Sequence, residues 1–168
     1  MKTSDNFRFS VVIPVKNEAS NICFVIEELD SVFENTEFLV VVGDSSDPTN
    51  EVLENIDRTC LNNKLQVIMQ EGVGKAGAVW TGLNKALGGV LIVFDGDRTI
   101  TAEDAHAVGA QAEEYGGLVI AERFNRREKN AMPLANYFYN SFMAFYSIWS
   151  LSKSVVICLL AVKHFVPK

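Results

Sequence analysis

Two aspartates separated by a single glycine follow a short apolar run in the middle of the chain. Asp95, Gly96 and Asp97 come directly after the apolar residues 90–94. A hard divalent cation prefers oxygen ligands and commonly takes one or two carboxylates together with substrate phosphates and water. The glycine between the carboxylates allows a ligand to approach the backbone closely. The segment therefore predicts a divalent-cation site, although an isolated sequence of this kind is also common in polar turns.

A glycine-rich segment at residues 72–77 offers a second kind of chemistry. It is not a P-loop, because Ala76 stands where a P-loop has Ser or Thr after its lysine. Its glycines match G-x-G-x-x-G, and Asp95 lies 23 residues after Gly72, which favours an NAD-dependent oxidoreductase. Two strand–helix units precede the segment, however, and Lys75 inside the turn suits a phosphate contact. A glycine-rich helix start without any ligand is the third interpretation.

Short apolar runs alternate with helical periodicity and must position these residues. Strands are predicted at residues 9–15, 38–42, 65–69, 90–94 and 118–121. Helices are predicted at residues 19–34, from Asp47-Pro48 onward, at 76–87 and at 103–115. This alternation predicts an α/β fold with a mostly parallel sheet between helices. Ligands bind beyond the carboxyl ends of such strands, so the polar residues that follow each strand should converge on one site.

Charge divides the chain into two parts. All 21 acidic residues lie at or before Glu128, where 11 basic residues leave a net charge of −10. This acidic body argues against nucleic acid as a partner, because phosphate binding needs a concentrated basic face. Three widely spaced cysteines exclude a disulfide framework and a thiolate zinc site, and they favour a reducing, cytoplasmic location.

The last 40 residues, 129–168, have a different composition. They contain four lysines and no acid, and residues 137–149 hold seven of the 17 aromatic side chains. This composition is typical of a helix at a membrane surface, and equally of a segment buried in a core or a dimer contact. Lys153 interrupts the apolar stretch, so a membrane-spanning helix is not expected. We therefore divide the chain into a body, residues 1–128, and an aromatic and apolar helical tail, residues 129–168.

Five motifs, in order along the chain, resemble those of the family-2 glycosyltransferases of the GT-A fold. They are V-V-I-P-V-K-N-E at 11–18, V-V-G-D-S-S-D-P-T at 41–49, G-K-A-G-A at 74–78, D-G-D at 95–97 and I-A-E-R-F at 120–124. The second motif has Gly43 in place of a family acid. The resemblance implies transfer of a sugar from a nucleotide-diphosphate donor. Within the family, the polyprenyl-phosphate (dolichyl-phosphate) mannose and glucose synthases look most similar.

The resemblance also implies roles for individual residues, and it makes residues 1–128 a nucleotide-sugar-binding core. The residues expected at the base and ribose are Pro14, Lys16, Glu18 and Asp44, with Lys75 near the nucleotide. Asp95, Gly96 and Asp97 resemble the D-x-D motif, whose two aspartates hold Mg²⁺ or Mn²⁺ against the diphosphate. Such a metal neutralises charge that develops on the leaving diphosphate. Arg123 matches an arginine near the acceptor phosphate, which in these synthases belongs to a polyprenyl phosphate.

The C-terminal part departs from the family pattern. When the family's D-T-x-C-G-like segment is aligned on Cys158, Val155 stands at the aspartate, and no acidic residue follows Glu128. No catalytic base is assigned for this reason. Two hypotheses remain beside the oxidoreductase. One is an active transferase at the cytoplasmic face of a membrane, with the tail as a membrane or homodimer contact. The other is a catalytically impaired protein that binds a nucleotide sugar.

Overall fold

The computed structural model describes residues 7–98, 100–116, 118–120 and 154–157. Its elements are, in chain order, β1 (Phe9–Val15), α1 (Ile22–Val32), β2 (Thr36–Val42), α2 (Thr49–Glu54), the 3₁₀ helix η1 (Arg58–Cys60), β3 (Lys64–Met69), α3 (Gly74–Lys85), β4 (Val90–Val93), α4 (Ala102–Tyr115), β5 (Leu118–Ile120) and β6 (Ser154–Ile157). The described strands form one sheet in the order β3-β2-β1-β4-β6-β5, and each pairing is parallel. The predicted parallel α/β sheet is therefore confirmed.

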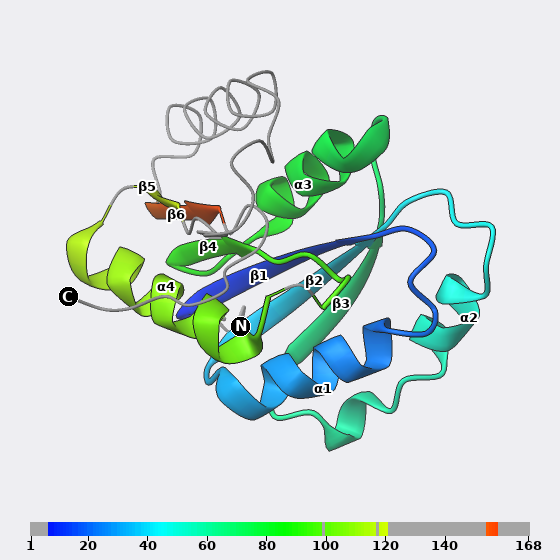
Figure 1. Cartoon of the computed structure of the whole chain (residues 1–168), viewed down its shortest axis with the longest axis horizontal. Coiled ribbons are helices and arrows are strands. Elements are labelled where there is room, and N and C mark those ends of the chain that lie inside the picture. The colour runs from blue at the N-terminus through cyan, green and yellow to red at the C-terminus, as the bar shows by residue number, and fades with distance from the viewer. Residues whose placement is uncertain (1–6, 99, 117, 121–153, 158–168) are drawn as a thin grey trace, which may run out of the picture.

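Helices cover both faces of the sheet, and the alternation of side chains along β1 explains how. Phe9, Val11 and Ile13 point to one face, where they join a core cluster with residues of α1 and α4. Val12 points to the other face and packs in a second cluster with Leu83 of α3. Figure 1 shows α3 on one side of the sheet and α1, α2 and α4 on the other. The fully apolar runs of β1 and β2 are thus explained by burial on both faces.

Element bounds differ from the predictions where polar groups form local hydrogen bonds. The first helix begins at Ile22 rather than at residue 19, because residues 18–21 form a turn in which the Glu18 carbonyl accepts from the Asn21 amide. β2 begins two residues earlier than predicted, at Thr36. Its first two residues, Thr36 and Glu37, are polar yet buried, so apolar periodicity could not identify them as strand residues.

The strand β6 was not predicted. Its residues, 154–157, fall in the apolar segment that we assigned to the helical tail, and they pair with both β4 and β5 in the centre of one half of the sheet. A short apolar run cannot be assigned to a strand or a helix by periodicity alone. None of the helices in the described ranges is long and apolar enough to cross a membrane.

The register of the strands brings their carboxyl ends to one level. Val15 of β1 is paired with Val42 of β2, and Val42 with Met69 of β3. β4 runs beside β1, and the Phe94 amide still donates to the Val12 carbonyl, at 2.9 Å, beyond the last residue of β4. The loops that follow these four strands therefore leave the sheet at the same edge.

Candidate functional site

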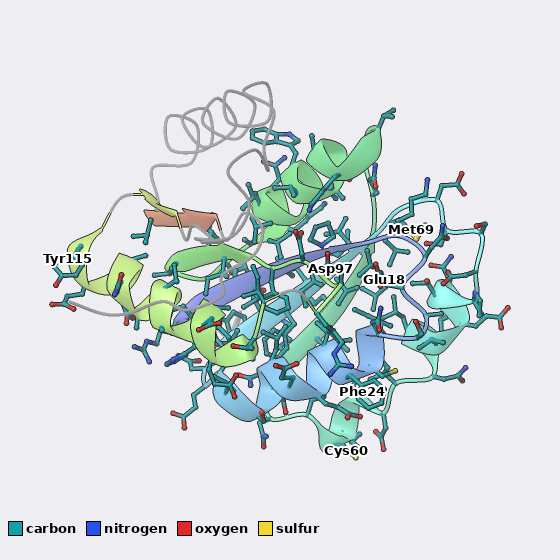
Figure 2. The ribbon with its side chains drawn as sticks, in the orientation of Figure 1. Glu18, Phe24, Cys60, Met69, Asp97 and Tyr115 are labelled. Carbon is teal, nitrogen blue, oxygen red and sulfur yellow. The ribbon has the colours of Figure 1, made fainter. Side chains whose placement is uncertain are left out.

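A pocket of about 660 Å³ lies at this edge, beyond the carboxyl ends of β1, β2, β3 and β4. Its lining includes each of the eight residues predicted to bind a nucleotide sugar, namely Pro14, Lys16, Glu18, Asp44, Lys75, Asp95, Gly96 and Asp97. Figure 2 shows Glu18 and Asp97, from the loops after β1 and β4, and Met69, the last residue of β3, at this edge, whereas Tyr115 lies at the far end of the molecule. The side chains come together only because parallel strands end side by side.

Asp95 is the most deeply buried acid of the pocket. The residue is 5% exposed, and its Oδ1 lies 2.6 Å from Nζ of Lys75. Its other oxygen, Oδ2, is buried and has no hydrogen-bond partner in the described part of the chain. A buried acceptor left without a partner costs about 1–3 kcal/mol. An open acceptor of this kind is expected where a ligand completes the site.

Asp97 differs from Asp95 although only Gly96 separates them. Asp97 is exposed, whereas Gly96 is buried, and a Cβ at Gly96 would lie 3.1 Å from Cγ1 of Val15. The chain turns after Asp97, since Arg98 has a left-handed backbone with φ of 60°. The described residues contain no group of three or more His, Cys, Asp or Glu side chains that could hold a metal by themselves. A cation held by these two aspartates would therefore need oxygen ligands from a substrate or from water.

The loops after β1 and β2 are joined by hydrogen bonds that leave their charged side chains to line the pocket. The Asn17 amide donates to Ser45 Oγ at 3.1 Å, and the Ser46 amide donates back to Asn17 Oδ1 at 2.8 Å. Asn17 has a φ of 59°, a left-handed conformation that asparagine tolerates better than most residues. Lys16, just before Asn17, and Asp44, just before Ser45, are both exposed and line the pocket.

Asp47 has a structural role, because its carboxylate links the loop after β1 to the loop after β2. Its Oδ2 accepts from the Ala19 amide at 3.1 Å, and its Oδ1 accepts from the amide and the hydroxyl of Thr49. The hydroxyl of Thr49, followed by these amide donors, holds the pKa of Asp47 below its usual value. The sequence predicts a helix from Asp47-Pro48 onward. In the structure Asp47 lies one position before the N-cap Pro48, and its carboxylate accepts from the first residue of α2, Thr49.

Glu18 both lines the pocket and orders the chain before α1. Its Oε2 accepts from the side-chain amide of Asn21 at 2.8 Å, which orders the turn before α1. The same half-buried side chain lines the pocket. The Glu18 amide donates to Thr49 Oγ1 at 3.0 Å, so that the start of α2 also determines where Glu18 lies.

Gln70 is a pocket residue that sequence reasoning missed. Its Nε2 donates to the carbonyls of Gly72 and Gly74, at 2.9 and 3.0 Å, and so holds the turn that carries Lys75. Gly72 and Gly74 have φ of 88° and 69°, which glycine adopts without strain. A Cβ at Gly43 would lie 2.9 Å from Gln70 Oε1, so Gln70 needs the space left by the glycine that replaces a family acid. Gln70 could have been recognised from the sequence, because it is a polar residue that directly follows a predicted strand and precedes a glycine-rich turn.

The glycine turn does not have the surroundings that the oxidoreductase alternative requires. In a dinucleotide-binding fold, the strand before the glycine turn is adjacent to the strand whose end carries the ribose-binding acid. Here the turn follows β3 and Asp95 follows β4, and β2 and β1 lie between these two strands. The match to G-x-G-x-x-G is therefore a local similarity of sequence.

Two other predicted regions lie outside the described residues. They are Arg123, the proposed acceptor contact, and the tail 129–168 apart from residues 154–157. The prediction that residues 129–168 form a unit separate from residues 1–128 is not tested by the described elements.

The chain is similar to known proteins both in sequence and in structure. The sequence pattern described as Glycosyl transferase family 2 matches residues 10–153. The chain is 29% identical over 125 residues to an undecaprenyl-phosphate 4-deoxy-4-formamido-L-arabinose transferase of Proteus mirabilis, a match that covers 72% of this chain and 38% of the relative. The protein of the same name from Salmonella paratyphi B is 25% identical over 137 residues, 77% of this chain and 42% of its own. The chain thus spans about two fifths of the length of these relatives.

Solved structures agree with the sequence comparison. The S. aureus TarS 1-349 complex with UDP-GlcNAc is 26% identical with a TM-score of 0.53, covering 76% of this chain and 37% of that chain. Glucosyl-3-phosphoglycerate synthase of Mycobacterium tuberculosis in complex with UDP has a TM-score of 0.57 at 15% identity, covering 95% and 72%. The likeness of folds confirms the predicted GT-A architecture. The comparisons give no support to the oxidoreductase alternative. By its sequence pattern over residues 10–153, the chain belongs to glycosyl transferase family 2.

Proposed function

We propose that this chain transfers a sugar from a nucleotide-diphosphate donor to an acceptor and that the pocket at the carboxyl edge binds the donor. One observation carries the proposal, namely that the eight residues chosen from family motifs line a single pocket. The pocket volume of about 660 Å³ lies within the usual range for small-molecule sites. Residues 1–128 would supply this donor-binding core, completed at the sheet by β6.

The proposed division of the pocket follows the loops. Pro14 lies near the end of β1, and Lys16, Glu18 and Asp44 come from the loops after β1 and β2; the four would surround the base and ribose. Lys75, in the first turn of α3, would contact the diphosphate, because the N-terminus of a helix favours anions and the ammonium adds a full charge.

Asp95 and Asp97 are proposed to hold Mg²⁺ or Mn²⁺. The residues present fit such an ion, since Asp95 offers a buried oxygen with no hydrogen-bond partner among the described residues, and Asp97 is exposed in the same pocket. The pocket lining contains four carboxylates and two lysines, a formal charge of −2 that repels a diphosphate. A divalent cation would neutralise that charge, and when bound it would stabilise the charge that develops on the leaving diphosphate.

The acceptor is proposed to be a polyprenyl phosphate. The curated relatives are undecaprenyl-phosphate sugar transferases by name, and Arg123 would bind the acceptor phosphate through its guanidinium group. A lipid acceptor is consistent with peripheral binding of the tail to the cytoplasmic membrane face, with a homodimer contact as the alternative role of the tail. Co-sedimentation with anionic liposomes separates the two roles.

Calorimetry with UDP-sugars and GDP-sugars in the presence of Mn²⁺ tests the donor site. We expect binding of one of these donors, and we expect Asp97→Ala to weaken it. Glu114→Ala removes an exposed carboxylate from the far end of α4 and serves as the matched control that leaves binding unchanged. Absence of binding, or binding that Asp97→Ala leaves intact, would contradict the proposal.

One observation favours a second candidate, a protein that binds the donor without transferring the sugar. When the family's D-T-x-C-G-like segment is aligned on Cys158, Val155 stands in place of its aspartate. A transfer assay with several polyprenyl phosphates distinguishes the two functions. Measurable transfer supports the enzyme, whereas donor binding without transfer to any acceptor supports the second candidate.

A further inference from the structure

Lys75 occupies one side of the acid that is proposed to hold the metal. Its Nζ lies 2.6 Å from Oδ1 of Asp95, and the side chains are 52% and 7% exposed, respectively. Asp95 Oδ2 has no hydrogen-bond partner in the described part of the chain. Among the described residues, therefore, the buried carboxylate of Asp95 is paired with one cation, the ammonium of Lys75.

The position of Lys75 in its helix makes this pairing informative. Lys75 is the second residue of α3, where the partial positive charge of the helix terminus disfavours a lysine. The pairing with Asp95 offsets that repulsion. Its half-exposed side chain has a flexible four-carbon stem, so the ammonium can turn to another anion near the terminus without disturbing the core. A diphosphate is such an anion, and the helix terminus favours it.

We infer that Lys75 is an exchangeable counter-ion of Asp95, which it releases when a nucleoside diphosphate binds, so that the nucleotide and the divalent cation bind cooperatively. The inference rests on the proposed donor and metal sites. Without nucleotide, a cation that approaches Asp95 meets the ammonium on the same carboxylate and is repelled by it. With nucleotide, Lys75 has the phosphates as an alternative partner, and Asp95 becomes available to the metal.

Thermodynamic linkage makes the inference measurable. If nucleotide binding raises the affinity for the cation by some factor, the cation must raise the affinity for the nucleotide by the same factor. Direct contact of the metal with the phosphates also contributes to this coupling factor. The part of the coupling between nucleotide and cation that depends on Lys75 is the part that is lost when the charge of Lys75 is removed.

The test is a titration with Mn²⁺, followed through the paramagnetic resonance signal of the free ion, with and without UDP or GDP. For Lys75→Met without nucleotide, we expect the Mn²⁺ dissociation constant to fall by roughly tenfold, within the usual range of coupling between sites. The enhancement of Mn²⁺ binding by nucleotide should shrink by a similar factor. Lys75→Arg keeps the charge and should resemble the unmodified protein.

Lys16→Met is the matched control, because it removes the same charge from the same pocket but from the loop after β1. If Lys16→Met strengthens Mn²⁺ binding as much as Lys75→Met does, the effect is one of general charge and the inference is wrong. Equal Mn²⁺ affinity in Lys75→Met and the unmodified protein also overturns it. Circular dichroism verifies that each variant folds, and Lys75→Gln replaces Lys75→Met if the latter does not.

The same titrations separate this inference from the proposed function. If calorimetry detects no nucleotide binding to the unmodified protein, the proposed donor site itself is wrong. If nucleotide and Mn²⁺ both bind but Lys75→Met leaves their coupling unchanged, the donor site stands and only the exchange of Lys75 is refuted.

Discussion

A buried carboxylate lies at each end of the parallel strands, and the two carboxylates differ in their hydrogen-bond partners. Glu37 of β2, at the amino edge, is fully buried. Its Oε1 accepts from Ser10 Oγ and the Leu87 amide, both at 2.5 Å, and its Oε2 accepts from Gln66 Nε2 at 3.3 Å. Asp95, at the carboxyl edge, has the Lys75 ammonium on one oxygen and no hydrogen-bond partner on the other in the described part of the chain.

The difference separates a carboxylate that holds the fold from one that is available to a ligand. Glu37 connects β2 to β1, β3 and the loop before β4, so each oxygen is used within the protein. Asp95 keeps one oxygen open and pairs the other with a half-exposed, flexible side chain. Burial alone does not distinguish the two residues, because both are buried. The hydrogen-bond and ion-pair partners of each carboxylate oxygen distinguish them.

The largest expected effect on stability comes from Glu37→Ala. Removal of this carboxylate leaves the Ser10 hydroxyl, the Leu87 amide and the Gln66 side chain without their acceptor in the interior. We expect a loss of about 3–5 kcal/mol in the free energy of unfolding, measured by urea denaturation. Glu114→Ala is the control and should change it by less than about 0.5 kcal/mol. A similarly small loss for Glu37→Ala would show that Glu37 is not structural.

Asp95→Asn should give the opposite pattern. The substitution keeps the shape of the side chain but removes the charge that Lys75 and the proposed metal require. We expect Mn²⁺ affinity in the presence of nucleotide to fall by at least about 100-fold, more than is typical for residues that only support a ligand. The free energy of unfolding should change by less than about 1 kcal/mol, because the ion pair is partly exposed. A large loss of stability would remove the contrast with Glu37.

Gln70→Ala is expected to have an intermediate effect, confined to the pocket. Loss of its bonds to the Gly72 and Gly74 carbonyls should loosen the turn before Lys75 and lower nucleotide affinity by about five- to tenfold, equivalent to one hydrogen bond. Gly43→Ala, which displaces Gln70, should act similarly. The double variant should be no worse than either single one, because both act through the same contact. Additive losses in calorimetry would contradict this coupling.

The smallest effect on the free energy of unfolding is expected for an exposed carboxylate that is paired with a cation. Glu113 of α4 accepts from Arg8, with Nη2 to Oε2 at 2.6 Å, and the two side chains are 42% and 41% exposed. The Arg8 hydrogen bond holds the pKa of Glu113 below its usual value. Its contribution is therefore present above the unfolded pKa of about 4.3 and is lost as the pH falls through the lower, folded pKa.

Glu113→Gln should accordingly lower the free energy of unfolding by at most about 1 kcal/mol at pH 7. The difference from the unmodified protein should shrink as the pH falls below about 4.3 and vanish once Glu113 is protonated in both states. Urea denaturation at a series of pH values measures this. A difference that does not shrink as the pH falls, or a loss as large as that of Glu37→Ala, would contradict the assignment to a surface ion pair.

Much of the fold followed from local patterns. The apolar runs at residues 9–15 and 90–94 identified buried strands, and the helical periodicity near residues 103–115 identified α4, which begins one residue earlier at Ala102. The start of β2 was missed because Thr36 and Glu37 are polar, and their burial depends on partners that lie far along the chain. β6 was missed because its four residues, three of them apolar, are too few to show a periodicity.

The sequence by itself determined which chemical groups are available and that they follow the ends of parallel strands. The family motifs then identified the eight pocket residues by number. Only the tertiary structure decided that Gln70 holds the glycine turn, that Asp47 joins two loops, and that Lys75 pairs with Asp95. The Asp47 and Lys75–Asp95 contacts join loops that follow different strands, and their geometry depends on the order β3-β2-β1-β4 in the sheet. Strand order is a long-range property, which local spacing along a chain does not encode.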